Sequence, residues 1–202
     1  MVNLLTTNET SFFREPKHFD FLAERATKAA ASSSAKPFRV WSAASSTGEE
    51  AYTIAMVLAE SLGSCPWEVV GTDISTRVLE HATAGKYAAD RAEQIPSACL
   101  SKYWSKNNDT KPCTIQATSQ LRERMRFIHM NLHGDWPSLG QFDVIFLRNV
   151  MIYFDMPAKA RLIQRVTEQL SETGYLFVGH SESLHAPGVP LKTVVPAVFQ
   201  RK

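Results

Sequence analysis

The stretch Phe38–Asp73, FRVWSAASSTGEEAYTIAMVLAESLGSCPWEVVGTD, decides the fold of this chain. It opens with a short apolar run, Phe38–Ala43, and closes with a second one, Glu68–Thr72, as expected of two buried strands. Between them, Gly48–Leu62 carries alanine, isoleucine and leucine on one side at helical spacing. A strand, a helix and a second strand in this order predict two parallel strands joined by a crossover helix.

The same alternation continues along the rest of the chain. Further strands are predicted at Arg126–His129, Phe142–Leu147 and Tyr175–Val178, and further helices at Ser11–Arg25, Ser75–Ala84 and Ala158–Leu170. Pro16 breaks the first of these helices near its start, and Leu191–Val195 with Ala197–Gln200 predicts a closing hairpin. The predicted fold class is therefore α/β, with a mostly parallel sheet covered by helices on both faces and an antiparallel C-terminal strand.

Two segments interrupt this alternation. Ala29–Pro37 is small and polar, which predicts a loop or short linker. Gly85–Arg124 is long and polar and lacks a clear strand–helix cycle, and a structureless stretch of that length is uncommon inside a compact domain. We therefore expect an inserted subdomain there, with short helices and a small sheet.

The bulk composition excludes several classes of protein. With 202 residues and a formal net charge of +2, the chain is the size of one domain and lacks the clustered basic face of a nucleic-acid-binding protein. Its three cysteines are widely spaced and form no CxxC pair, which argues against a zinc site and a disulfide framework. No segment has the character of a signal peptide or a membrane span, so we expect a cytoplasmic protein without direct membrane insertion.

The loop Ala43–Gly48 follows the first strand and predicts a ligand site. In open parallel sheets, ligands bind beyond the carboxyl ends of the strands, and the small side chains of this loop allow a ligand to approach the backbone. Glu49 and Glu50 follow at once in the first turn of the helix. Two carboxylates there would repel a pyrophosphate but attract the ammonium group of an aminoacyl ligand.

Asp73 ends the second strand and has two possible roles. Its carboxylate could accept hydrogen bonds from both ribose hydroxyls of a nucleoside, as in dinucleotide-binding folds. It could equally cap the helix that starts near Ser75. The preceding loop favours the ribose role, although the chain has no GxGxxG pattern.

Four longer motifs carry a resemblance to a known family. They are Thr6–Glu15 (TTNETSFFRE), Val40–Glu50 (VWSAASSTGEE), Phe142–Phe154 (FDVIFLRNVMIYF) and Gly179–Glu182 (GHSE). Together they resemble the chemotaxis receptor methyltransferases, which methylate glutamate side chains of chemoreceptors. The resemblance implies a class I S-adenosylmethionine-dependent methyltransferase fold (Rossmann-like) over residues 1–202, with a small subdomain inserted at 85–125. It also implies S-adenosylmethionine as cofactor, S-adenosylhomocysteine as product and no metal.

The resemblance further assigns roles to single residues. Arg14 and Tyr153 are implied as active-site residues, with Glu50 on the cofactor's amino group and Asp73 on its ribose. The implied cofactor-binding set as a whole is Asn8, Thr10, Arg14, Glu50, Asp73, Asn131, Leu132, Arg148 and Asn149. Within it, Asn131 and Leu132 bracket the adenine, and Arg14 is better suited to clamp the acceptor carboxylate, which it matches in shape.

Each of these roles has a plainer structural alternative. Arg14 could be a surface arginine paired with Glu15 or Asp20, Asn131 could be a simple turn residue, and Tyr153 could be a core tyrosine. The polar groups of Arg148 and Asn149 need partners at the end of their strand, and a cofactor can supply them.

The resemblance also bears on partners. Family members begin with a helical domain that contributes to receptor docking, and since the sequence starts almost at the TTNETSFFRE motif, we expect that domain to be missing. The expected partners are the cytoplasmic helices of chemoreceptors. In some members the small β subdomain binds a tethering peptide at the receptor's C-terminus. Such members tend to carry a glycine-containing loop, whereas Lys106–Gln116 (KNNDTKPCTIQ) has no glycine, so no tether is expected.

Other functions fit the sequence less well. A nicotinamide-dependent oxidoreductase would share the sheet but is disfavoured by the acidic helix start and the missing glycines, and a cofactor-binding module without catalysis remains a second alternative. The GHSE motif is not a nucleophile elbow, because no GxSxG follows a strand. His129 and His133 lie four residues apart, but a strand followed by a turn does not place them as a helical metal-binding pair.

Overall fold

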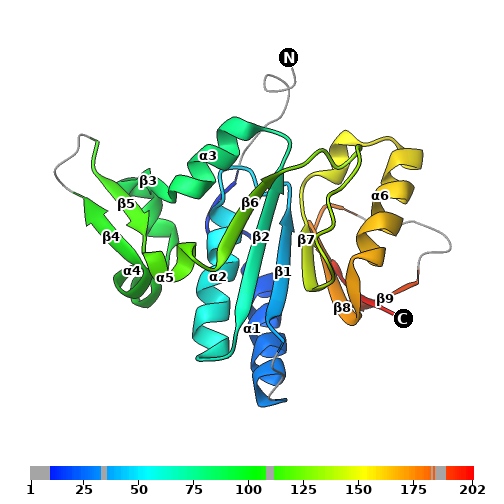
Figure 1. Ribbon diagram of the computed structural model, residues 1–202, viewed down its shortest axis with the longest axis horizontal. Coiled ribbons are helices and arrows are strands. Elements are labelled where there is room, and N and C mark those ends of the chain that lie inside the picture. The colour runs from blue at the N-terminus through cyan, green and yellow to red at the C-terminus, as the bar shows by residue number, and fades with distance from the viewer. Residues whose placement is uncertain (1–9, 33–35, 108–111, 183, 185–189) are drawn as a thin grey trace.

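The computed structural model describes residues 10–32, 36–107, 112–182, 184 and 190–202. They form an α/β structure around one seven-stranded sheet with the strand order β6-β2-β1-β7-β8-β10-β9 (Figure 1). The strands are β1 (Phe38–Ala43), β2 (Trp67–Asp73), β6 (Met125–His129), β7 (Phe142–Leu147), β8 (Leu170–Val178), β9 (Leu191–Val195) and β10 (Val198–Arg201). Pairs among β6, β2, β1, β7 and β8 are parallel, whereas β10 runs antiparallel to both β8 and β9. The predicted fold class is thus confirmed.

Helices cover both faces of this sheet because its strands carry apolar side chains on both sides. On one face, α1 (Pro16–Ala31) and α2 (Glu49–Leu62) pack on the sheet, and the rings of Phe19, Phe146 and Phe177 stack on one another. On the other face, α6 (Met156–Glu168) packs on a second cluster built around Trp41. A further helix, α3 (Thr76–Ala84), lies beside β6 and β2.

The chain between α3 and β6 forms a small separate sheet. Its strands are β3 (Lys86–Ala88), β5 (Thr114–Ala117) and β4 (Trp104–Asn107) in that order, with the 3-10 turn Ala89–Gln94 and the short helices α4 (Ser97–Tyr103) and α5 (Ser119–Arg122) around them. Figure 1 shows this small sheet standing apart from the large one, on the side of α3. The rings of Phe12, Tyr87 and Trp104 meet edge to face and join it to the N-terminal segment.

Several element boundaries that the sequence predicted are wrong. Helix α1 runs on to Ala31, α6 already begins at Met156, and β8 begins at Leu170 and not at Tyr175. The helix expected at Ser11–Arg25 begins only at Pro16, because Phe13 and Glu15 adopt left-handed backbone angles with φ of 53° and 61°. The helix expected to run to Leu170 ends at Glu168, and Leu170 already opens β8. By contrast, the strands Phe38–Ala43 and Phe142–Leu147 have the bounds that the sequence predicted.

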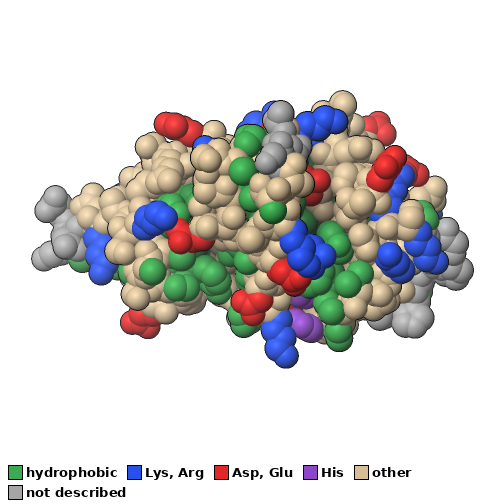
Figure 2. All heavy atoms as spheres, turned by 90° about the horizontal axis from the view of Figure 1, so that it is seen from below, with side chains coloured by type: hydrophobic (Ala, Val, Ile, Leu, Met, Phe, Trp, Pro, Cys, Tyr) green, Lys and Arg blue, Asp and Glu red, His purple; other side chains and the backbone are tan. Residues whose placement is uncertain are grey.

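The surface carries no large patch of one charge on the face that Figure 2 shows, where acidic and basic side chains are intermixed among hydrophobic ones. This agrees with the balanced charge of the sequence. In the part of the chain that the structure describes, no helix has both the length and the apolar character needed to cross a bilayer.

Candidate active site

A cavity of about 230 Å³ opens where the parallel strands end. It lies among the loops after β1, β2, β6 and β7, together with the segment that precedes α1, which is the expected place for a ligand on such a sheet. Every predicted site residue that the structure describes lines this cavity: Thr10, Arg14, Glu50, Asp73, Asn131, Leu132, Arg148, Asn149 and Tyr153. Asn8 lies outside the described residues.

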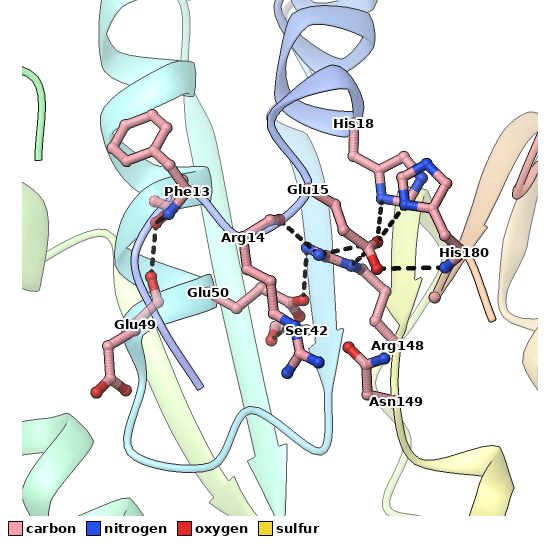
Figure 3. Close-up of polar contacts among 12 residues, drawn as sticks. Phe13, Arg14, Glu15, His18, Ser42, Glu49, Glu50, Arg148, Asn149 and His180 are labelled. Carbon is pink, nitrogen blue, oxygen red and sulfur yellow. Dashed lines mark hydrogen bonds and ion pairs between the residues drawn. The ribbon is translucent and has the colours of Figure 1, made fainter. Parts of the chain in front are cut away.

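Arg148, at the end of β7, connects several of these segments. Its side chain is only 2% exposed, and its guanidinium lies 3.0 Å from Glu15 Oε2 and 3.1 Å from Glu50 Oε2 (Figure 3). It also donates a hydrogen bond to the backbone carbonyl of Arg14. A cofactor was expected to supply partners for Arg148, but the protein itself supplies them.

The two acids at the start of α2 have separate environments. Glu50 Oε1 accepts a hydrogen bond from Ser42 Oγ at 2.7 Å, and burial raises the pKa of its carboxyl, although Arg148 and Ser42 oppose this. Glu49 instead accepts a hydrogen bond from Thr47 Oγ1 at 2.6 Å and does not line the cavity. Figure 3 shows the two carboxylates pointing apart. Of the pair that the sequence singled out, only Glu50 can therefore meet a ligand.

Asp73 joins two loops at the rim of the cavity. Its Oδ2 accepts the backbone N–H of Ser46 at 2.9 Å, and its Oδ1 accepts that of Ser75 at 3.0 Å. Ser75 is the residue before α3, so this second bond closes a local turn and does not cap the first helical N–H groups. Each carboxylate oxygen keeps a further lone pair that can accept a ligand hydroxyl.

The loop after β6 forms an apolar wall of the cavity. Met130 and Leu132 are buried there, and the ring of His133 stacks on Phe154 with centroids 4.1 Å apart. The side chain of Asn131 accepts the backbone N–H of His133 at 2.9 Å, so it does stabilise the turn, as the plainer reading held. Asn131 also lines the cavity, and its turn role leaves the amide group able to face a ligand.

Arg14 and Tyr153 reach the cavity from distant parts of the chain. Tyr153 closes the 3-10 turn Met151–Tyr153 and is 46% exposed, so it is not a core tyrosine. Figure 3 shows the side chains of Arg14 and Glu15 pointing in different directions. Glu15 turns toward Arg148 and the histidines, whereas Arg14 lines the cavity.

The sequence analysis assigned no role to the group formed by Glu15, His18 and His180. Glu15 Oε2 lies 3.3 Å from His18 Nδ1 and 3.2 Å from His180 Nδ1, and the two imidazole rings stack with centroids 4.8 Å apart. Burial alone would raise the pKa of Glu15, but Arg148, the His180 N–H and the two histidines lower it below its ordinary value. Glu15 lies in the TTNETSFFRE motif and His180 in the GHSE motif. Their places in these motifs were the features of the sequence that could have pointed to this group.

This group is also the one set of three possible metal ligands that the described residues bring together. The Arg148 guanidinium already occupies Glu15 Oε2 at 3.0 Å. A metal ion at the same oxygen would be repelled by that positive charge. His129 and His133, the other pair considered as metal ligands, have separate partners. His129 Nε2 lies 2.9 Å from the carbonyl oxygen of Ile74, and the ring of His133 stacks on Phe154.

The parallel sheet and the ligand cavity at its carboxyl edge, with Glu50 and Asp73 in the lining, are those of the S-adenosylmethionine-dependent methyltransferase fold. Residues 8–195 match the family described as "CheR methyltransferase, SAM binding domain", where SAM is S-adenosylmethionine, and the chain belongs to this family.

Two related proteins support the same family. Chemotaxis protein methyltransferase 2 of Pseudomonas aeruginosa is 43% identical, over 92% of this chain and 67% of that protein. The chemotaxis protein methyltransferase of Escherichia coli is 40% identical, over 90% of this chain and 63% of that protein. The chain thus spans about two thirds of the length of these relatives.

Among solved structures, a TehB-like SAM-dependent methyltransferase from Corynebacterium glutamicum is 14% identical, with a TM-score of 0.47 over 92% of this chain and 97% of that one.

His18 makes the stability of the fold depend on pH. Its ring is 2% exposed, and burial together with the nearby Arg148 lowers its pKa from 6.5 to about 4. The folded state therefore favours the neutral ring, and its contribution is complete above pH 6.5 and is lost as the pH falls toward 4. At 1.36 kcal/mol per pKa unit, the loss is about 3 kcal/mol.

We expect the unfolding free energy of the native protein to fall more than that of His18→Phe between pH 7 and pH 4, by up to about 3 kcal/mol. Urea unfolding at several pH values measures this difference. His81→Phe, at an exposed histidine of α3, is the control and should follow the native protein. Parallel curves for His18→Phe and the native protein would contradict the assignment.

Proposed function

We propose that this chain is the catalytic domain of a protein-glutamate O-methyltransferase. It would transfer a methyl group from S-adenosylmethionine to glutamate carboxylates of chemoreceptor cytoplasmic domains, forming methyl esters during chemotaxis adaptation. The observation that carries the proposal is a single cavity lined both by the acids suited to the cofactor, Glu50 and Asp73, and by the pair suited to the acceptor, Arg14 and Tyr153. The names of the related proteins favour the same chemistry.

The cavity suits S-adenosylmethionine better than a dinucleotide. Glu50 would hold the cationic amino group, Asp73 the ribose hydroxyls, and Asn131 with Leu132 the adenine, while Thr10, Arg148 and Asn149 complete the wall. Ser45 Oγ is buried at the same wall without a hydrogen-bond partner among the described residues, and a polar ligand would satisfy it. Asn8 keeps its proposed place in this set.

The acceptor side needs alignment more than acid–base chemistry. The cofactor supplies a methyl group on an activated sulfonium, and a glutamate carboxylate is already ionised at neutral pH, so no general base is required. Arg14 would bind the acceptor carboxylate through its planar fork, and Tyr153 would orient the attacking oxygen. Closing these groups around the acceptor removes water and fixes the line of attack.

The proposal includes the setting of the reaction. Residues 1–202 would act as the methyltransferase domain with residues 85–125 as an inserted subdomain. The partners would be receptor helices in the cytoplasm, with no nucleic acid, membrane insertion or metal involved.

Two titrations and one assay test the proposal. Calorimetry should show binding of S-adenosylhomocysteine and none of NADH, because the cavity offers carboxylates where a dinucleotide brings phosphates. Transfer of labelled methyl groups to receptor fragments would separate an enzyme from a cofactor-binding module without catalysis. Binding of NADH alone would favour the oxidoreductase, and tight cofactor binding without any methyl transfer would favour the binding module.

We expect Asp73→Ala to weaken binding of S-adenosylhomocysteine by roughly 10- to 100-fold, the usual loss when charge-assisted hydrogen bonds are removed. Calorimetry measures the affinity. Because Asp73 also bonds Ser46 and Ser75, thermal unfolding must be recorded beside it. Asp90→Ala, at an exposed acid of the inserted region, serves as the control. Unchanged affinity in Asp73→Ala would refute the ribose role.

We expect Arg14→Ala to lower turnover by about 100-fold at saturating cofactor while the affinity for S-adenosylhomocysteine changes little, because a misplaced acceptor costs rate and not cofactor binding. Arg14→Lys is the matched variant, since it keeps the charge and loses the planar fork. It should recover only part of the rate. Equal turnover in Arg14→Ala and the native enzyme would remove Arg14 from the mechanism.

We also expect no binding of a receptor C-terminal tethering peptide, because the loop between β4 and β5 has no glycine. Residues 108–111 of that loop lie outside the described residues. Titration of the chain with such a peptide measures this, and saturable binding would show the prediction to be wrong.

A further inference from the structure

The turn that follows β7 carries several residues of the cavity but has little regular structure of its own. Arg148 and Asn149 leave the strand, and the 3-10 turn Met151–Tyr153 follows directly. Asn149 has a φ of 57°, in the left-handed region that a residue other than glycine adopts only at a cost. A contact from outside the turn would stabilise this conformation.

Glu182 supplies that contact from beyond the end of β8. Its Oε2 accepts the backbone N–H of Asn149 at 2.8 Å and that of Gly179 at 2.9 Å. Its Oε1 accepts the backbone N–H of Met151 at 2.9 Å. One carboxylate thus bonds both ends of the Asn149–Met151 turn and ties them to the chain after β8. Charge-assisted bonds of this kind are shorter and stronger than neutral ones.

Gly179 lets the two loops come this close. A Cβ atom at that position would lie 2.7 Å from Asn149 Nδ2 and 3.0 Å from Glu182 Oε2. Any side chain there would push Asn149 away from the loop or displace the carboxylate. The glycine and the acid of the GHSE motif therefore serve the same contact.

We propose that Glu182 is a positioning residue for methyl transfer, which fixes the turn that presents Arg148, Asn149 and Tyr153 to the cavity. It does not line the cavity, so it would act through the turn and not by direct contact with a ligand. This inference rests on the proposed function, because it assigns Glu182 to the same site. It explains why an acid 33 residues along the chain is tied to the cavity turn.

Glu182→Gln tests the proposal with little change in shape. The glutamine NH₂ group cannot accept a hydrogen bond, so at least one of the backbone N–H groups loses its partner. We expect kcat for labelled methyl transfer to fall by about 10- to 100-fold, the effect of small misplacement in an active site. The melting temperature should change far less than it would for loss of a core residue. Glu172→Gln, at an exposed acid of β8, is the control and should keep full activity.

The outcomes distinguish a failure of the positioning role of Glu182 from a failure of the proposed function. If the native chain and the control transfer methyl groups and Glu182→Gln does so at the same rate, the positioning role is overturned while the proposed function stands. If the native chain neither binds S-adenosylhomocysteine nor transfers methyl groups, the proposed function fails. Should Glu182→Gln not fold, Gly179→Ala disturbs the same turn while keeping the carboxylate, and it should show the same loss of rate. Full activity of Gly179→Ala would overturn the role.

Hydrogen exchange in the native protein tests the contact without any substitution. The amides of Asn149 and Met151 bond no backbone group of a helix or strand, so they should be protected only if Glu182 holds them. Exchange as fast as in an open turn would overturn the proposal whatever the activity of the chain.

Discussion

The buried Arg148 guanidinium is the group on which the candidate site depends. With its side chain 2% exposed, its charge must be compensated inside the protein, and Glu15 and Glu50 compensate it from two different segments. Removing one partner of such a buried pair typically costs about 3–5 kcal/mol, because the other charge stays buried alone. The segment before α1, the start of α2 and the end of β7 are therefore held together as one unit, and the cavity lies where they meet.

This pairing also affects the charges that a ligand would meet. The Arg148 guanidinium faces two carboxylates, while Arg14 brings a second guanidinium to the lining of the cavity. Burial raises the pKa of Glu50, and a cationic group bound next to it would favour its ionised form. Glu15 has the opposite shift, because Arg148 and the histidines outweigh the effect of burial. A cationic ligand would thus lower the pKa of Glu50. Glu15 is already paired with Arg148 and His180 within the protein.

Much of this arrangement could be predicted from the sequence, and the exceptions have a physical reason. The bounds of β1 and β7 were predicted because each is a short, mostly apolar run that lies between polar loops. The start of α1 was not, because Phe12 and Phe13 are spaced like core residues of a helix. In fact their backbone N–H groups bond the distant side chains of Gln94 and Thr53. Local periodicity carries no information on such contacts, and the same holds for the backbone N–H groups that donate to Glu182.

Three of the left-handed residues near the cavity share one feature that periodicity could not show. Phe13, Ser46 and Asn149 have φ between 49° and 57°, and each donates its backbone N–H to a side chain. The acceptors are Thr53 Oγ1, Asp73 Oδ2 and Glu182 Oε2. These hydrogen bonds offset the cost of the left-handed angles, which for each residue is about 1–3 kcal/mol. Asp73 therefore has a structural role beside its proposed ribose contact. The cavity is shaped by side chains that hold strained turns as much as by those that would touch a ligand.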